Sequence, residues 1–133
     1  MRGKLQRGKE VLMNIMKENE EGNIIGVQRV RVKYKGAVAY VRAQEISYIE
    51  AFGWRSVLHT DSGELVCGRM IGELVDELAG IGVCRCHRGY AVNMNRVTAL
   101  RAGYAVTDSG DSVPIGRRYR FEAKENYEKW GGK

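Results

Sequence analysis

The stretch CRCHRGYAVNMNRV, residues 84–97, decides how the fold and the chemistry of this chain are interpreted. It holds two of the chain's three cysteines, one of its two histidines and three of its arginines. Alternate residues of a strand face opposite sides, so Cys84 and Cys86 would share one face and His87 the other. That arrangement makes a poor catalytic dyad. The other histidine, His59, shows no orienting partner in the sequence, and Cys-x-Cys is not the usual spacing of a zinc clip. We therefore expect small, buried cysteines and look to the arginines for function.

Short alternating segments surround this stretch. On its N-terminal side, alternation begins near residue 28 in VQRVRVKY, AVAYVR and EISYIEA. The runs SVLHT (56–60) and ELVC (64–67) then flank an Asp-Ser-Gly turn, as in a hairpin. On the C-terminal side, the runs RCH, YAVNM, VTALRA, YAVTD and SVPIG recur at the spacing of a β-rich domain. The residues therefore predict a mainly β fold built from short strands.

Three segments have helical periodicity instead. Residues 69–78, RMIGELVDEL, form a short amphipathic pattern, and the tail from Arg118 has an apolar helical face as well. Residues 5–19 carry an apolar stripe that ends at the polar run ENEEGN. We expect two short helices within the domain and an N-terminal amphipathic helix before it.

Almost all the excess of basic over acidic residues lies in one segment. The formal net charge is +6, and residues 85–120 carry seven basic side chains against two acidic ones. All seven are arginines: Arg85, Arg88, Arg96, Arg101, Arg117, Arg118 and Arg120. Arginine is preferred for planar, bidentate contact with phosphate or a guanine edge. The pattern favours a nucleic-acid partner, with a membrane surface or a plain solvated face as the alternatives.

Other classes of protein find little support in the sequence. The longest apolar run, AVAYV, is too short to span a bilayer, and the start MRGKLQRGKE lacks the apolar region of a signal peptide. We therefore expect a cytoplasmic protein. The sequence has no Gly-rich phosphate loop, GxSxG elbow, HExxH pair or paired catalytic carboxylates. We expect no enzymatic activity, no cofactor and no small-molecule substrate.

The order of these features resembles a known family. The segments ISYIEA (46–51), VLHTDSGEL (57–65), the short helix, CRCHRGYAVNMNRV and VPIGRRY (113–119) follow the pattern of the LytTR domain, a bacterial DNA-binding module. The resemblance covers about residues 29–127. It implies a fold of small, mostly antiparallel sheets with a little helix. It also implies docking through loops, which family members insert into successive major grooves of imperfect direct-repeat sites.

The resemblance assigns the DNA-facing positions. The loop after the family's E-A signature falls on residues 52–55, the residue after the motif histidine is Arg88, and an arginine pair closes the last strand. By this resemblance the DNA-binding residues are Trp54, Arg55, Arg88, Arg117 and Arg118. We expect Arg88 and Arg118 to read base edges, because each can donate bidentately to guanine.

The role of Trp54 is open, and three further positions have expected roles. Trp54 could stack on a sugar, touch a thymine methyl group or fold back onto the sheet. Gly116 stands where the family usually has a serine, so a phosphate-binding hydroxyl is missing there. We expect His87 to be hydrogen-bonded beneath the binding edge, and Asn93 to bond to turn backbone.

We predict a domain organisation of an N-terminal helical extension at residues 1–28 and a LytTR-like domain at residues 29–130. The family module is most often joined to a response-regulator receiver, for which the first 28 residues leave no room. The chain is then a stand-alone regulator or a fragment. Its N-terminal helix could bind a second copy of the chain or a membrane-bound antagonist, or it could pack on its own sheet.

The sequence thus predicts a sequence-specific transcriptional regulator that binds double-stranded DNA. One alternative is a protein-interaction module that kept the fold and lost DNA reading. The other is a thiol redox sensor, in which the charges of Arg85 and Arg88 lower the pKa of Cys86.

Overall fold

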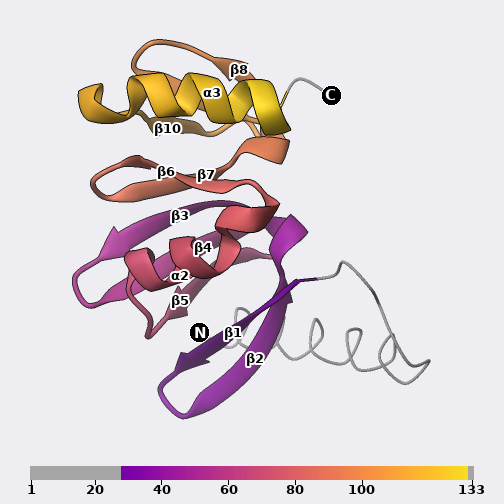
Figure 1. Ribbon diagram of the computed structural model, residues 1–133. Coiled ribbons are helices and arrows are strands. Elements are labelled where there is room, and N and C mark those ends of the chain that lie inside the picture. The colour runs from indigo at the N-terminus through magenta and orange to yellow at the C-terminus, as the bar shows by residue number, and fades with distance from the viewer. Residues whose placement is uncertain (1–27, 132–133) are drawn as a thin grey trace.

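Three small antiparallel sheets make up most of the described chain (Figure 1). The computed structural model describes residues 28–131. The strands are β1 (Arg29–Tyr34), β2 (Ala37–Arg42), β3 (Ile46–Phe52), β4 (Arg55–Thr60), β5 (Gly63–Cys67), β6 (Val83–His87), β7 (Tyr90–Asn93), β8 (Val97–Leu100), β9 (Tyr104–Thr107) and β10 (Ser112–Pro114). The central sheet has the order β5-β4-β3-β7-β6, β1 and β2 form a hairpin, and the third sheet has the order β10-β9-β8. The predicted mainly β fold with antiparallel sheets is confirmed.

Two α-helices lie within this range, as the sequence predicted. Helix α2 (Ile71–Leu78) lies in front of the central sheet in Figure 1, and α3 (Arg120–Trp130) lies against the third sheet. Helix α3 begins two residues later than the sequence pattern indicated, because residues 117–119 form a 3-10 turn, η4 (Arg117–Tyr119). The other 3-10 turns are η1 (Ala43–Glu45), η2 (Ala79–Ile81) and η3 (Met94–Arg96). The N-terminal helix expected over residues 5–19 lies outside the described residues.

The alternating sequence pattern produces two hydrophobic clusters. The first lies between α2 and the central sheet, where Ile49 and Leu58 of the sheet meet Leu74 and Leu78 of the helix, all without solvent exposure. The second lies between the central sheet, the third sheet and α3, and is built from residues such as Val92, Met94, Val113 and Ala123. Each cluster buries the apolar face that its helix or sheet could not keep in water.

Neighbouring elements also cover both edges of the central sheet. At the β5 edge, the amide of Gly68 donates to the carbonyl of Lys33 at the end of β1, at 3.0 Å. At the β6 edge, the amide of Gly116 donates to the carbonyl of Cys86 at 2.8 Å. The three sheets are therefore joined through backbone hydrogen bonds, and residues 28–131 form one continuous body.

The antiparallel topology sorts the connections between strands onto two opposite sides of the molecule. On one side, at the left in Figure 1, lie the β3–β4 and β6–β7 turns and the start of α3. Backbone hydrogen bonds join neighbouring connections here: Ala51 N to Gly89 O at 2.8 Å and Ile115 N to Gly103 O at 2.9 Å. On the other side, Asp108 N donates to Arg96 O at 2.8 Å. Connections far apart in the sequence therefore become neighbours, and this positions the candidate site.

Candidate nucleic-acid interface

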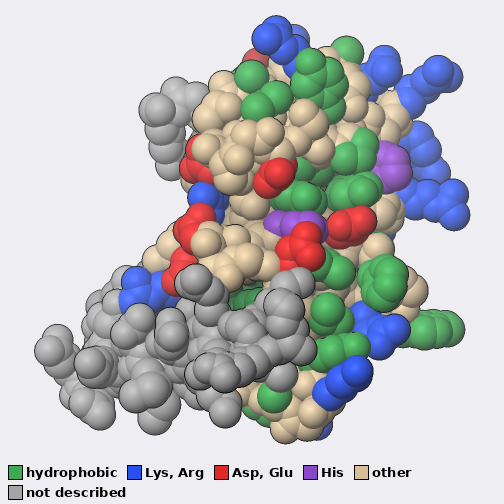
Figure 2. Space-filling model, turned by 180° about the vertical axis from the view of Figure 1, so that it is seen from behind, with side chains coloured by type: hydrophobic (Ala, Val, Ile, Leu, Met, Phe, Trp, Pro, Cys, Tyr) green, Lys and Arg blue, Asp and Glu red, His purple; other side chains and the backbone are tan. Residues whose placement is uncertain are grey.

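One side of the molecule carries arginines and no acids in its connections. We call it the basic edge, and define it by the residues from 52 to 55, 88 to 89, 101 to 103 and 115 to 120. Its six arginines are all exposed: Arg55, Arg88, Arg101, Arg117, Arg118 and Arg120. These four connections contain no Asp or Glu. Figure 2 shows Lys and Arg side chains gathered along one side of the upper part of the molecule, near a histidine. The structure therefore brings Arg55, Arg88, Arg117 and Arg118, predicted from the sequence, to one side.

The turn that carries Arg88 is held by its own neighbours. Arg85 Nε donates to the carbonyl of His87 at 3.0 Å, and its Nη2 donates to the carbonyl of Arg88. The amide of Gly89 donates to His87 Nδ1 at 3.0 Å. His87 thus bonds to the turn backbone beneath the edge, as expected from the sequence. The role of Arg85 was missed, because charge counting treats a bracing arginine and an exposed one alike.

A second connection lies directly beside this turn. His87, Arg88 and residues 116–119 line a hollow of about 440 Å³. The bond from Gly116 to Cys86 ties the two segments together, and η4 then turns Arg117 and Arg118 outward, where both are exposed. A hollow with guanidinium groups on both sides can accept a phosphate or the edge of a base.

Gly116 has an ordinary backbone conformation, with φ of −70°. A Cβ atom there would lie 3.3 Å from the ring of Tyr119 and 3.6 Å from that of His87. The space beside the glycine is therefore nearly filled, and a larger residue would press on both rings. Because residue 116 is a glycine, it cannot supply the serine hydroxyl that the family resemblance led us to expect here.

The β3–β4 turn presents two aromatic rings. Gly53, with φ of +62°, is the first of its two connecting residues, which is the pattern of a type II′ hairpin turn. The side chain of Trp54 is 79% exposed and that of Phe52 is 58% exposed. Trp54 therefore does not fold back onto the sheet, which removes one of the three alternatives for this residue.

Arg55 is less free than the other arginines of the basic edge. Its guanidinium carbon lies 5.6 Å from the ring centre of Phe52 and 5.8 Å from that of Tyr34. One of its nitrogens is 3.5 Å from the hydroxyl of Tyr34. Contacts between a cation and aromatic faces of this kind restrict the side chain while leaving its charge in place. Arg55 therefore adds positive charge to the basic edge, and its side chain is less free than an unrestrained arginine to reach a base.

Arg96 does not belong to the basic edge. Its guanidinium lies on the opposite side, 2.7 Å from Asp61 and 2.9 Å from Asp108, and it also donates to the carbonyls of Gln44 and Glu45 at 3.3 and 3.1 Å. Treating residues 85–120 as one basic segment was therefore wrong for this residue, which joins three connections instead. The sequence held no sign of this, because the acids come from distant turns.

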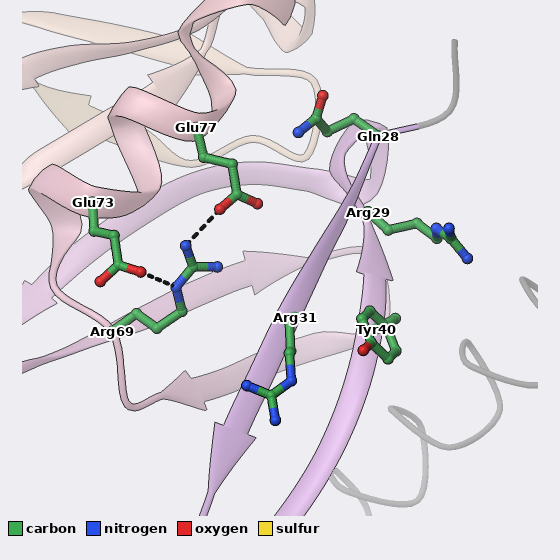
Figure 3. A pocket seen from close by; sticks show the side chains of 7 residues that line it. All are labelled: Gln28, Arg29, Arg31, Tyr40, Arg69, Glu73 and Glu77. Carbon is green, nitrogen blue, oxygen red and sulfur yellow. Dashed lines mark hydrogen bonds and ion pairs between the residues drawn. The ribbon is translucent and has the colours of Figure 1, made fainter. Parts of the chain in front are cut away.

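Arg69 is also neutralised within the protein. It lies in a hollow of about 650 Å³ between the β1–β2 hairpin and α2, which Figure 3 shows from close by. The guanidinium points between Glu73, at 2.8 Å, and Glu77, and makes an ion pair with each. Arg29 and Arg31 of β1 line the same hollow. Because its charges are mixed, this hollow is a weaker candidate for a polyanion than the basic edge.

The cysteines are buried, as expected, and all three are free thiols. Burial raises the pKa of Cys86 to about 12, and this outweighs the opposing effect of Arg85. Burial likewise raises the pKa of Cys84 to about 11. Arg85 does lower the pKa of Cys86, as the redox-sensor alternative supposed, but burial raises it by more. A thiol of such pKa carries almost no thiolate near neutral pH, so the redox-sensor alternative finds no support here.

His59 has carboxylate partners, contrary to the expectation from the sequence. Its Nε2 lies 3.1 Å from Glu50 and its Nδ1 lies 3.5 Å from Glu64, while its ring stacks on Tyr48 with centroids 4.0 Å apart. The sequence did not reveal these partners because they depend on strand register. Glu64 of β5 lies directly opposite His59 of the neighbouring strand β4. The cysteines lie in the core, so no thiol joins this group.

Within residues 28–131, no three His, Cys, Asp or Glu side chains are grouped so that they could hold a metal ion. In the same part of the chain, neither α-helix is long and apolar enough to cross a membrane. Asn93 is buried, and its side-chain oxygen accepts from the amide of Asn95 in the η3 turn at 3.1 Å, as expected from the sequence. Its Nδ2 also donates to the carbonyl of Ile46 in β3 at 2.9 Å.

A mainly β module with exposed arginines along one side is compatible with binding to nucleic acid, and comparison with known proteins gives the family. The model of the LytTr DNA-binding domain family matches residues 36–128. The chain belongs to this family.

Two relatives describe the similarity further. The CO-responsive transcriptional regulator RcoM of Rhodospirillum rubrum is 37% identical over 84 residues, which are 59% of this chain and 36% of that protein. The chain thus spans about a third of the length of that curated relative. A solved LytTr DNA-binding domain from Bacillus cereus has a TM-score of 0.65 and 21% sequence identity, covering 76% of this chain and 97% of the other. That similarity shows the fold.

Proposed function

We propose that this chain is a sequence-specific transcriptional regulator that binds double-stranded DNA through its basic edge. The observation that carries the proposal is the sorting of charge: six exposed arginines line connections that contain no acid. Double-stranded DNA attracts such an edge through its phosphates, and arginine can also read base edges in the major groove. Family membership supports the same conclusion. From the family resemblance we take the target to be a direct repeat in a promoter.

The arginines of the edge have different roles in this proposal. Arg88 and Arg118 read bases, because each lines the hollow beside Gly116 and stands on a short turn whose backbone is held by hydrogen bonds. Fixed turns reduce the entropy lost when a side chain is ordered on DNA. Arg117, on the same turn as Arg118, neutralises phosphates and fixes the register.

The β3–β4 turn makes a second contact of a different kind. Arg55 is held between two rings and supplies charge, while Trp54 stands in solvent beside it. A rigid, exposed tryptophan can touch a thymine methyl group or stack on a sugar at small entropic cost. We assign Trp54 to an apolar contact with the DNA next to the bases that Arg88 reads.

The test is selection from a randomised duplex pool at two salt concentrations, with sequencing of the retained DNA. Wild-type protein is expected to retain a paired direct repeat. Arg88→Ala and Arg118→Ala should each lose preference at one defined base, by about 1 to 3 kcal/mol of discrimination. The matched control is Lys129→Ala, since Lys129 is exposed on α3 outside the basic edge.

Two outcomes would contradict the proposal. Retention that depends on salt and not on sequence would make the basic edge a general electrostatic patch. An unchanged consensus in both arginine variants would mean that other residues read the bases. In either case the folded state of each variant is checked first by circular dichroism, so that loss of structure is not mistaken for loss of reading.

A further inference from the structure

A second hollow lies where the basic edge meets α3. Its volume is about 480 Å³, within the range of small-molecule sites. Its apolar lining comes from Leu100 at the end of β8, from Ile115 after β10, and from Ala123 and Tyr127 of α3. This surface is distinct from the hollow beside Gly116, with which it shares no lining residue.

The charges around this second hollow are unequal. Arg101, Arg120 and Lys124 line it, and all three are exposed. Glu128 is its one acidic lining residue among those described. An apolar floor with an excess of positive charge at the rim complements a ligand that is apolar over most of its length and anionic at one end.

The helix gives the hollow a direction. Residues 120, 123, 124, 127 and 128 lie on one face of α3, at helical spacing. From Arg120 to Glu128 the helix rises about 12 Å. Arg120 begins the helix, and the connection that carries Arg101 meets Ile115 through the hydrogen bond from Ile115 N to Gly103 O. The positive end of the hollow therefore lies at the basic edge, and Glu128 lies at the far end.

We infer that this hollow binds an amphipathic organic anion, of the class of medium-chain carboxylates, whose head group lies at Arg101 and Arg120 and whose chain lies along Leu100, Ile115 and Tyr127. An extended chain fits the direction of α3, and Glu128 disfavours an anion in the reverse orientation.

Binding of such an anion regulates the basic edge. The carboxylate neutralises Arg101 and Arg120, two of the six arginines of that edge, and occupies donors that would otherwise meet phosphates. The ligand therefore lowers affinity for DNA, and by linkage DNA lowers affinity for the ligand. This regulatory part rests on the proposed function, whereas the binding site itself does not.

The site is tested without DNA, by calorimetric titration of the full chain with decanoate. Decanoate is expected to bind with one site per chain. Decyltrimethylammonium, with the same chain length and opposite charge, should bind at least about tenfold more weakly, because the head group meets positive charge. Equal binding of the two probes, or no binding of decanoate, would overturn the inference.

Variants locate the site. Ala102 lines the hollow and is exposed, so Ala102→Trp fills it from the rim without disturbing the core. This exchange should abolish decanoate binding, and Arg120→Gln should weaken it about tenfold. Lys129→Gln, on α3 outside the lining, should leave it unchanged. Decanoate binding that survives Ala102→Trp would place the ligand elsewhere and contradict the inference.

DNA binding is then measured with and without saturating decanoate. Wild-type affinity for DNA should fall about fivefold or more, and Ala102→Trp should show no response to decanoate. Unchanged wild-type affinity would overturn the regulatory part. A chain that binds decanoate at the hollow but never binds DNA would instead contradict the proposed function, so the two failures are distinguishable.

Discussion

Individual arginines in this chain have similar surroundings in the sequence and different roles in the structure. Arg85 and Arg88 lie three residues apart, yet the first donates to the carbonyls of His87 and Arg88 while the second is exposed. Arg96, in the same basic segment, bonds to two aspartates and two carbonyls on the opposite side. The number of protein acceptors around each guanidinium decides whether it can serve a ligand.

Arg96→Ala is expected to destabilise the protein without changing DNA preference. The exchange leaves Asp61, Asp108 and the carbonyl of Glu45 without this donor, and we expect the free energy of unfolding to fall by about 1 to 3 kcal/mol. Urea denaturation measures the loss, and the selected DNA consensus is compared with that of wild type. Arg117→Ala, an exposed control, should show a stability change within about 0.5 kcal/mol. Equal stability of the two variants would contradict the assignment of Arg96.

Arg85→Lys tests whether the bracing of the turn matters for reading. Lysine keeps the charge, but it lacks the planar fork that lets Arg85 bond to two successive carbonyls. Affinity for the preferred site should fall while the salt dependence stays as in wild type, because no phosphate contact is removed. Binding isotherms at several salt concentrations check this. Unchanged affinity for the preferred site would contradict the bracing role of Arg85.

Buried titratable groups predict a loss of stability at alkaline pH. Burial raises the pKa of Cys86 from 9.0 to about 12 and that of Tyr48 from 10.0 to about 12. Both groups therefore hold their protons more tightly in the folded state, and the stability that this gives is complete below pH 9 and is lost as the pH rises toward 12. Urea midpoints measured at increasing pH should fall above pH 9, and less steeply in Cys86→Ala. Identical slopes would contradict the role of this thiol.

Elements follow the sequence pattern closely where their partners are local. The hairpin of β4 and β5 and the helix α2 were predicted, because turn residues and apolar spacing lie within one short segment. The pairing of β3 with β7 and the contact between Gly116 and β6 were not, since they join residues far apart in the chain. The resemblance named Arg88 and Arg118 from their local motifs. Their position on one shared hollow depends on contacts between distant segments, so it came only from the structure.

A comparison of Gly53 and Gly82 distinguishes the cost of backbone strain from the cost of a steric clash. Gly53 and Gly82 both have positive φ, +62° and +102°. A Cβ atom at Gly53 meets nothing within 4 Å, whereas at Gly82 it would lie 2.5 Å from the Asn95 side chain and 3.1 Å from Trp130. Gly53→Ala should cost about 1 kcal/mol from strain, and Gly82→Ala should cost clearly more. Thermal unfolding of the two variants makes the comparison, and equal costs would contradict the packing of Trp130 against Gly82.

At the scale of the whole molecule, short connections between antiparallel strands separate charge. The basic edge holds six arginines, and the opposite side holds Asp61, Asp108 and Asp111 with Arg96. No single element has this polarity. It arises because connections from distant parts of the sequence meet on the same side, and it orients the molecule toward a polyanion before any specific contact forms.

The separation of charge predicts that DNA affinity depends on salt concentration through all the arginines of the basic edge together. The logarithm of DNA affinity should fall linearly with the logarithm of salt concentration, and each phosphate contact removed should reduce the slope by about 0.9. Arg117→Gln should therefore lower the slope and leave the consensus unchanged. A variant consensus with an unchanged slope would reverse the roles assigned to Arg117 and Arg118.

The covered edges of the central sheet have a consequence for how copies of this protein meet. An open strand offers a row of backbone groups on which another chain can add itself, which is a route to aggregation. Here Gly68, which directly follows β5, already donates to Lys33 of β1, and Cys86 of β6 already accepts from Gly116. These hydrogen bonds leave fewer free backbone groups with which an added strand could pair at each edge.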